Sequence, residues 1–166
     1  MTDNPQLPLG LALQDSARFD SYFPGQNREV VQHLQQAASG TGENLVYVAG
    51  ARGLGKTHLL QAACHCASQC DRSSTYLPLQ ELLEFAPILL EELEQLDLIC
   101  LDDIAAVAGD GVWERGLFDL FNRVRSAGST LLVAGEQRPG QSGLTLPDLV
   151  SRLGWGVIYT LKPLAD

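Results

Sequence analysis

Basic residues are scarce in this sequence. Lys56 and Lys162 are its two lysines, and Lys and Arg together number 11 against 20 acidic residues, for a formal net charge of -9. The acid is concentrated between positions 81 and 103, and no segment forms a basic stripe. A protein that neutralises many nucleic-acid phosphates needs clustered Lys and Arg. We therefore expect no autonomous DNA binding, and we expect proteins as the direct partners.

Long apolar runs are also missing. No stretch approaches the ~18 apolar residues of a membrane-spanning helix, and no basic region precedes the short apolar stretch near the N-terminus. We expect neither membrane association nor a secretory signal. The four cysteines lie in helix-like and strand-like runs, which suits the reducing cytoplasm. Neighbours on a helix point about 100° apart, so Cys64, His65 and Cys66 are not expected to converge on a zinc ion.

The length of 166 residues is typical of one domain. Residues 1–24 are expected to form an N-terminal arm and residues 25–166 the main domain, whose first helix is expected to be capped by Asn27. Apolar runs predict strands at 45–49, from 76, at 98–101, at 131–134 and at 157–159. Helix-like patterns separate them at 58–69, at 82–96 with an interruption at Pro87, at 113–124 and at 147–153. Strands that alternate with helices predict an α/β fold, with three layers and a mostly parallel sheet.

The predicted helix at 113–124 has two distinct faces. Its apolar stripe consists of Trp113, Leu117, Leu120, Phe121 and Val124. Its opposite face carries Glu114, Arg115, Asp119 and Arg123. Gly128 is expected to end the helix.

Residues 50–57 form a complete G-x-x-x-x-G-K-T phosphate loop, between a predicted strand and a predicted helix. Its glycines are Gly50, Gly53 and Gly55. They let successive N–H groups point at phosphate oxygens, and the helix N-terminus adds its dipole. Lys56 is expected to reach the β- and γ-phosphates and the Thr57 hydroxyl to bind Mg²⁺. The alternative is a glycine-rich turn that binds nothing.

A pair of acids completes the expected site. Asp102 and Asp103 follow the strand at 98–101 directly, at the edge of an open α/β sheet where ligands bind. Asp102 is the candidate partner of Mg²⁺, which it would hold either through another metal ligand or through water. Asp103 is the candidate base or water-positioning group. A strand followed by an acidic turn is the alternative.

Several segments together resemble the AAA+ domain of the bacterial DnaA family. They are FDSYF at 19–23, GQN at 25–27, the phosphate loop, the acidic pair, and SRLGWG at 151–156. Within this family the sequence is similar to the Hda branch, whose members inactivate the DnaA initiator. The resemblance implies a P-loop NTPase base domain that binds ADP or ATP with Mg²⁺.

The same resemblance implies roles for four further residues. Arg152 corresponds to the arginine finger, which acts on nucleotide bound to a neighbouring DnaA protomer; alternatively, it caps its helix. Glu136 falls at the first sensor position, where the family usually has Asp or another polar group. Phe23 lies in the segment that packs on adenine, or else staples the following helix. His58, directly after the motif, is included among the nucleotide-binding residues.

The arm carries a short peptide similar to the sliding-clamp motif of replication proteins. Its residues are Gln6, Leu7, Leu9 and Leu11, interrupted by Pro8 and Gly10. Alternate leucines of an extended segment can enter an apolar groove while Gln6 makes directed hydrogen bonds. The implied partner is the DNA polymerase III sliding clamp. A flexible tail that contains leucines by chance is the alternative.

Two features depart from a full initiator. We expect no helix-turn-helix domain after Asp166, and we expect the helical lid of AAA+ modules to be missing, either because the chain is a fragment or because the gene is short. We therefore expect a negative regulator of replication initiation that mainly activates hydrolysis on DnaA. Weak hydrolysis of its own and a homo-oligomeric state are left open. The alternative is a self-contained ATPase of helicase-loader type.

Overall fold

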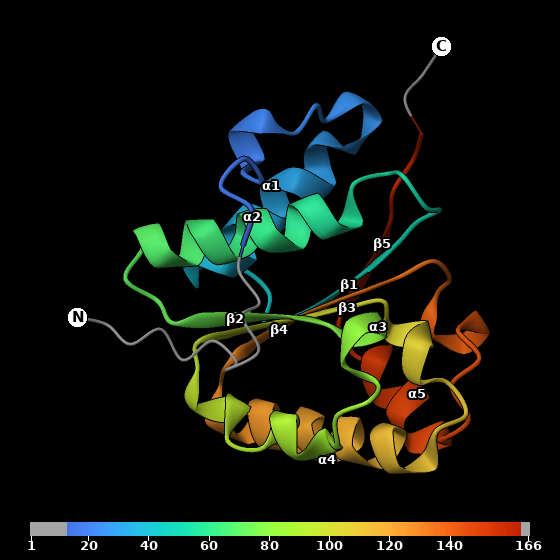
Figure 1. Cartoon of the computed structure of the whole chain (residues 1–166). Coiled ribbons are helices and arrows are strands. Elements are labelled where there is room, and N and C mark those ends of the chain that lie inside the picture. The colour runs from blue at the N-terminus through green and yellow to red at the C-terminus, as the bar shows by residue number, and fades with distance from the viewer. Residues whose placement is uncertain (1–12, 164–166) are drawn as a thin grey trace.

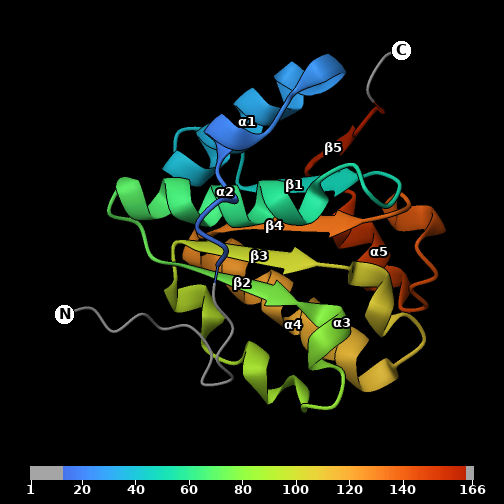
Figure 2. The ribbon, with the colours of Figure 1, turned by 45° about the horizontal axis from the view of Figure 1, so that its top comes forward.

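A computed structural model describes residues 13–163 of the chain. Its sheet contains five parallel strands in the order β2-β3-β4-β1-β5 (Figure 2). The strands are β1 (Leu45–Ala49), β2 (Ser74–Pro78), β3 (Leu98–Asp102), β4 (Thr130–Gly135) and β5 (Val157–Thr160). Parallel neighbours require crossover helices, and the alternating sequence supplies them. The predicted parallel α/β fold is confirmed.

Helices cover both faces of the sheet. On one face lie α1 (Arg28–Ser39) and α2 (Lys56–Gln69); on the other lie α4 (Gly111–Ala127) and α5 (Pro147–Leu153) (Figure 1). Each face of the sheet has its own hydrophobic core, and side chains of β3 alternate between them. Leu98 and Cys100 lie in the core under α1 and α2, and Ile99 and Leu101 lie in the core under α4 and α5. This alternation explains why the strand is apolar at every position.

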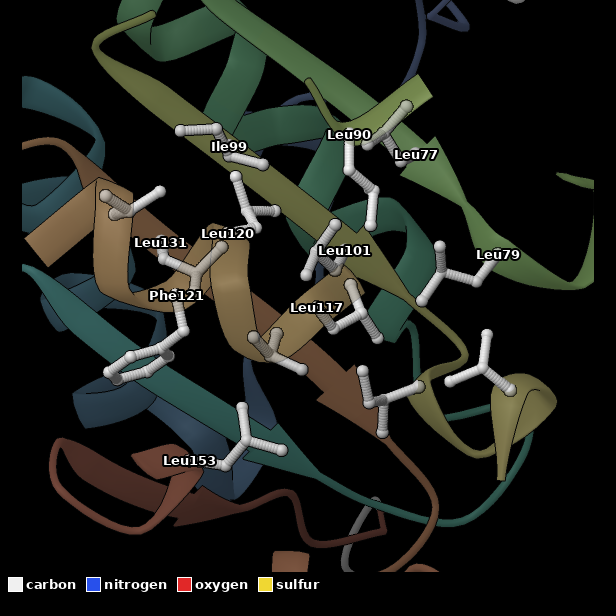
Figure 3. Packing of buried hydrophobic residues seen from close by; sticks show 14 of the residues in the cluster. Leu77, Leu79, Leu90, Ile99, Leu101, Leu117, Leu120, Phe121, Leu131 and Leu153 are labelled. Carbon is white, nitrogen blue, oxygen red and sulfur yellow. The ribbon is translucent and has the colours of Figure 1, made fainter. Parts of the chain in front are cut away.

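The core beneath α4 is built mainly from leucines. Leu117, Leu120 and Phe121 of α4 face Ile99, Leu101 and Leu131 of the sheet (Figure 3). Leu120 is fully buried, and burying such a side chain contributes about 1.5–3 kcal/mol. The predicted apolar stripe of this helix is confirmed, as is its end at Gly128, which has φ 78°.

The helix predicted over 82–96 is wrong. The chain forms a single turn, α3 (Leu79–Leu82), and then two 3₁₀ turns at Pro87–Leu90 and Leu93–Gln95. Ala86 is extended, with φ -67° and ψ 156°, because a following proline disfavours the helical region. Glu92 is left-handed, with φ 65°, which separates the two 3₁₀ turns.

Glu114 lies opposite the apolar stripe of α4, yet the residue is 1% exposed. Its carboxylate accepts hydrogen bonds from the backbone N–H groups of Gly109, Thr145 and Leu146, at 2.7–3.0 Å. The segment that leads into α5 therefore covers one end of this polar helix face.

Within the described residues, no helix has the length and apolar character needed to cross a membrane.

Candidate nucleotide-binding site

The glycine-rich loop joins the end of β1 to the start of α2. Its first residue stays in register with the sheet, because the Gly50 N–H donates to the Gly135 carbonyl at 3.1 Å. Gly53 and Gly55 are left-handed, with φ 85° and 91°, a conformation that side chains rarely adopt. A Cβ on Gly53 would meet no atom within 4 Å, so the loop borders open space. Its backbone can approach a bound group closely there.

Lys56 places an ammonium group inside this loop. The residue is 8% exposed, and Nζ donates to the carbonyls of Gly50 and Ala51 at 2.5 and 3.0 Å. Among residues 13–163 it forms no ion pair. Burial lowers the pKa of Lys56, and the charges of Asp102 and Glu136 oppose that change. A buried cation held by carbonyl groups alone fits a polyphosphate ligand.

Asp102 lies at the end of β3 and is 1% exposed. Its Oδ2 accepts hydrogen bonds from the hydroxyls of Thr57 and Tyr76, both at 2.6 Å. Its Oδ1 accepts the Asp103 N–H at 3.0 Å. A hydroxyl and a carboxylate held side by side offer the oxygen ligands that Mg²⁺ prefers. Thr57 and Asp102 therefore fit a magnesium ion next to the phosphate loop.

Asp103 follows in a left-handed conformation, with φ 59° and ψ 56°. Such a conformation is uncommon for a residue with a side chain and is frequent at functional sites. Burial raises the pKa of Asp103, and the neighbouring charge of Asp102 raises it further. An exposed carboxylate beside Thr57 and Asp102 can orient or deprotonate a water molecule.

Glu136 comes directly after β4, the strand between β1 and β3. It therefore lies between the phosphate loop and the acidic pair. The side chain is exposed and approaches Arg52 of the loop, with Oε2 3.8 Å from Nε. Its charge also acts on the pKa of Lys56. The structure thus brings this expected sensor to the same sheet edge as the loop, Lys56, Thr57 and both aspartates.

The segment before α1 contacts the loop through Tyr22, which the sequence did not single out. The Tyr22 hydroxyl donates to the Leu54 carbonyl at 2.9 Å, and its ring lies where a Cβ on Gly55 would project. Phe23, the expected aromatic, is 70% exposed. His58 faces the same segment, with Nε2 2.7 Å from the Arg18 carbonyl oxygen. The aromatic residues of the FDSYF segment indicated a contact near the nucleotide site. The sequence did not indicate that Tyr22, and not Phe23, would contact the loop.

Arg152 lies in the last turn of α5, away from these residues. Its guanidinium stacks 4.1 Å from the centre of the Trp155 ring and 5.3 Å from that of Phe118. Its Nε donates to Asn122 Oδ1 at 3.3 Å. Trp155 precedes β5, whose Val157 pairs with Val46 near the start of β1. The phosphate loop follows the other end of β1, and a five-residue strand spans about 16 Å.

Comparison with known proteins identifies the family. The family model described as the bacterial DnaA ATPase domain matches residues 13–160. The chain belongs to this family. The fold is also similar to domain III of Thermotoga maritima DnaA, with a TM-score of 0.80, 23% identity, and coverage of 93% of this chain and 70% of that one.

Two further structures share the fold of this DnaA-family domain. The first is AMPPCP-bound DnaA from Aquifex aeolicus, with a TM-score of 0.77 and 22% identity over 90% of this chain. This chain spans about half of that one, 51%. The second is the DnaC helicase loader, with a TM-score of 0.66 and 18% identity over 89% of this chain and 98% of that chain. The sheet and loop are those of a DnaA-type AAA+ base domain. The clamp-like residues Gln6, Leu7, Leu9 and Leu11 lie outside the described residues and stay a prediction.

Proposed function

We propose that this DnaA-family domain binds ADP or ATP together with Mg²⁺. The buried Lys56 ammonium, bonded only to carbonyl oxygens among the described residues, supports a polyphosphate ligand. The 2.6 Å hydrogen bond between Thr57 and Asp102 supports an adjacent magnesium ion, which would neutralise charge on the phosphates. Aquifex aeolicus DnaA, which shares this fold, binds the adenine nucleotide AMPPCP.

We propose further that the chain is a regulator of the Hda type, which ends initiation by promoting hydrolysis of ATP bound to DnaA. The arm would tether it to the sliding clamp through Gln6, Leu7, Leu9 and Leu11, and Arg152 would act on the neighbouring protomer. The position of Arg152 carries this proposal. The arginine contacts Trp155, Phe118 and Asn122, and Trp155 precedes the strand that pairs with the start of β1, whereas the loop follows the end of β1.

The Arg152 guanidinium is prepared for such a role. Within residues 13–163 it donates one hydrogen bond, from Nε, so both terminal nitrogens can reach a partner's phosphate oxygens. Two aromatic rings restrict its rotation, which reduces the entropy lost when it contacts the transition state. Charge grows on the phosphate oxygens during transfer, and an arginine supplied by a partner accelerates such reactions by about 10³–10⁵.

A second candidate function is hydrolysis by the chain itself, as in an ATPase of helicase-loader type. The observation in its favour is the position of Asp103, an exposed carboxylate directly after the candidate magnesium carboxylate at the end of β3. The fold shared with the DnaC helicase loader is compatible with this candidate as well. Here Asp103 would position water on the chain's own nucleotide, and Arg152 would be dispensable for a single protomer.

One experiment separates these functions. Phosphate release is measured for the chain alone, for DnaA–ATP alone, and for both with clamp-loaded DNA, using wild type, Arg152→Ala and Arg28→Ala. Arg28 is an exposed arginine of α1 and serves as the matched control. We expect release above the sum of the separate reactions for wild type and Arg28→Ala, and its loss in Arg152→Ala. Equal release by the chain alone would support the second candidate. Stimulation that survives Arg152→Ala would refute the arginine's role.

A further inference from the structure

Asp102 has one hydroxyl partner that the magnesium site does not use. Tyr76 of β2 is 8% exposed, and its hydroxyl donates to Asp102 Oδ2 at 2.6 Å. Thr57 donates to the same oxygen at the same distance. Thr57 belongs to the phosphate-loop motif, whereas Tyr76 lies on β2, the strand next to that of Asp102, and matches no motif. A short hydrogen bond to a buried carboxylate is one of the stronger contacts in a protein.

We propose that Tyr76, backed by Gln61 of α2, is a positioning residue for Asp102 and sets how far Mg²⁺ strengthens nucleotide binding. This inference rests on the proposed nucleotide-binding function. Tyr76 is not expected to touch the nucleotide or the metal. It acts by holding the carboxylate plane and its charge where the metal and its water ligands need them.

The bonds of Asp102 show why the tyrosine matters. The Asp103 N–H holds Oδ1, and two hydroxyls hold Oδ2. When Mg²⁺ binds, the Thr57 oxygen becomes a metal ligand, so its geometry follows the metal. Tyr76 is then the donor on Oδ2 whose position is independent of the metal. Asp102 is 1% exposed, so water cannot easily replace a missing donor.

Gln61 of α2 lines the same polar hollow as the tyrosine. It is 5% exposed, and its Oε1 accepts the Gln14 N–H at 2.9 Å. Because a backbone N–H can only donate, this bond orients the amide so that its NH₂ group is free to donate elsewhere. Burial raises the pKa of Tyr76 and the Asp102 charge raises it further, while hydrogen bonds with Thr57 and Gln61 oppose the rise. The tyrosine therefore remains a protonated donor at neutral pH.

The side chains of Gln61, Tyr76 and Asp102 line one polar hollow of about 270 Å³ at the end of β2 and β3. Gln14 and Asp103 also line this hollow. One hydrogen bond joins the N-terminal segment at Gln14 to Gln61, and another joins Tyr76 to the candidate magnesium carboxylate, within this one hollow. A tyrosine that served packing alone would not need its hydroxyl on the same carboxylate oxygen that accepts the Thr57 hydroxyl.

The test measures ADP affinity by calorimetry, with Mg²⁺ and with EDTA, on the whole chain. The ratio of the two affinities is the readout, since loss of folded structure or of packing would lower both. We expect Tyr76→Phe to reduce this ratio by about tenfold, the effect of one charge-assisted hydrogen bond, and to leave the EDTA affinity unchanged. A Mg²⁺ titration at fixed ADP should shift to higher concentration by a similar factor.

Two further variants complete the design. Gln61→Met keeps the side-chain volume and should reduce the same ratio by a smaller factor; it also tests the inference if Tyr76→Phe does not fold. Tyr159→Phe is the matched control. It removes a tyrosine hydroxyl on the edge strand β5 that is hydrogen-bonded to His33 of α1. It should leave the ratio unchanged.

The outcomes distinguish the two proposals. If Tyr76→Phe keeps the wild-type ratio, or lowers both affinities equally, the positioning role is overturned while nucleotide binding stands. If wild type binds ADP in neither buffer, the nucleotide-binding proposal itself fails.

Discussion

The buried Glu114 carboxylate yields the sharpest stability prediction. It joins the turn before α4, at Gly109, to a distant backbone segment at Thr145–Leu146, through bonds of 2.7–3.0 Å. The second segment leads directly into α5, which carries Arg152. Burial alone would raise the pKa of Glu114, but the N–H groups of Thr145, Gly109 and Leu146 outweigh it and hold the pKa below its usual value.

Glu114→Gln is expected to lower the free energy of unfolding by about 2–4 kcal/mol. The amide keeps one accepting oxygen but turns an NH₂ group toward backbone donors, and each buried donor left unpaired costs about 1–3 kcal/mol. For a domain of this size, the loss corresponds to a fall in Tm of about 5–12 °C. The matched control, Glu91→Gln, changes an exposed glutamate and should stay within about 0.5 kcal/mol of wild type.

Urea unfolding followed by circular dichroism measures both variants, at neutral pH and in acid. Because the folded-state pKa of Glu114 is lowered, its stabilisation is present above the ordinary glutamate pKa and is lost as pH falls through the folded value. Wild type should therefore lose its advantage over Glu114→Gln in acid. If Glu114→Gln matches Glu91→Gln at neutral pH, the assignment of structural energy to this carboxylate is wrong.

Two predictions concern the nucleotide site. Lys56→Ala should lower nucleotide affinity by about 100-fold or more, the equivalent of a charge-assisted contact worth about 3 kcal/mol, as measured by calorimetry; affinity within a few-fold of wild type would remove Lys56 from the site. Asp103→Asn should raise the neutral-pH unfolding free energy by about 0.5 kcal/mol, because asparagine tolerates the left-handed backbone and relieves repulsion with Asp102. Because the pKa of Asp103 is raised in the folded state, protonation at low pH stabilises wild type, and the stability advantage of Asp103→Asn should shrink. An advantage of Asp103→Asn that grows in acid would contradict the reasoning.

Local sequence patterns were sufficient to find the phosphate loop and the residues that we propose as its magnesium partners. The glycines, Lys56 and Thr57 are adjacent in the chain, so the loop geometry follows from the backbone conformations that those residues permit. Asp102 was also accessible, since the end of an apolar strand in a parallel sheet has one predictable place. Glu136 at the same edge follows from the same rule, applied to β4.

The failures have a common physical origin. The 82–96 segment has helical periodicity, but Pro87 and a left-handed Glu92 interrupt it, and its apolar side chains pack onto α4 through short turns instead. Glu114 occupies a polar position of the helical pattern, yet a loop more than 30 residues away supplies its hydrogen bonds. Periodicity describes one element, and it carries no information on which distant backbone will cover that element.

The sequence by itself determined the layered α/β fold, the phosphate loop and the carboxylate beside it, because each depends on residues close together in the chain. Only the tertiary structure decided that Tyr22 contacts the loop, that Tyr76 holds Asp102, and that Arg152 lies away from its own loop. These contacts join elements separated by at least 26 residues, and such pairings arise from strand order and helix packing, which local composition does not encode.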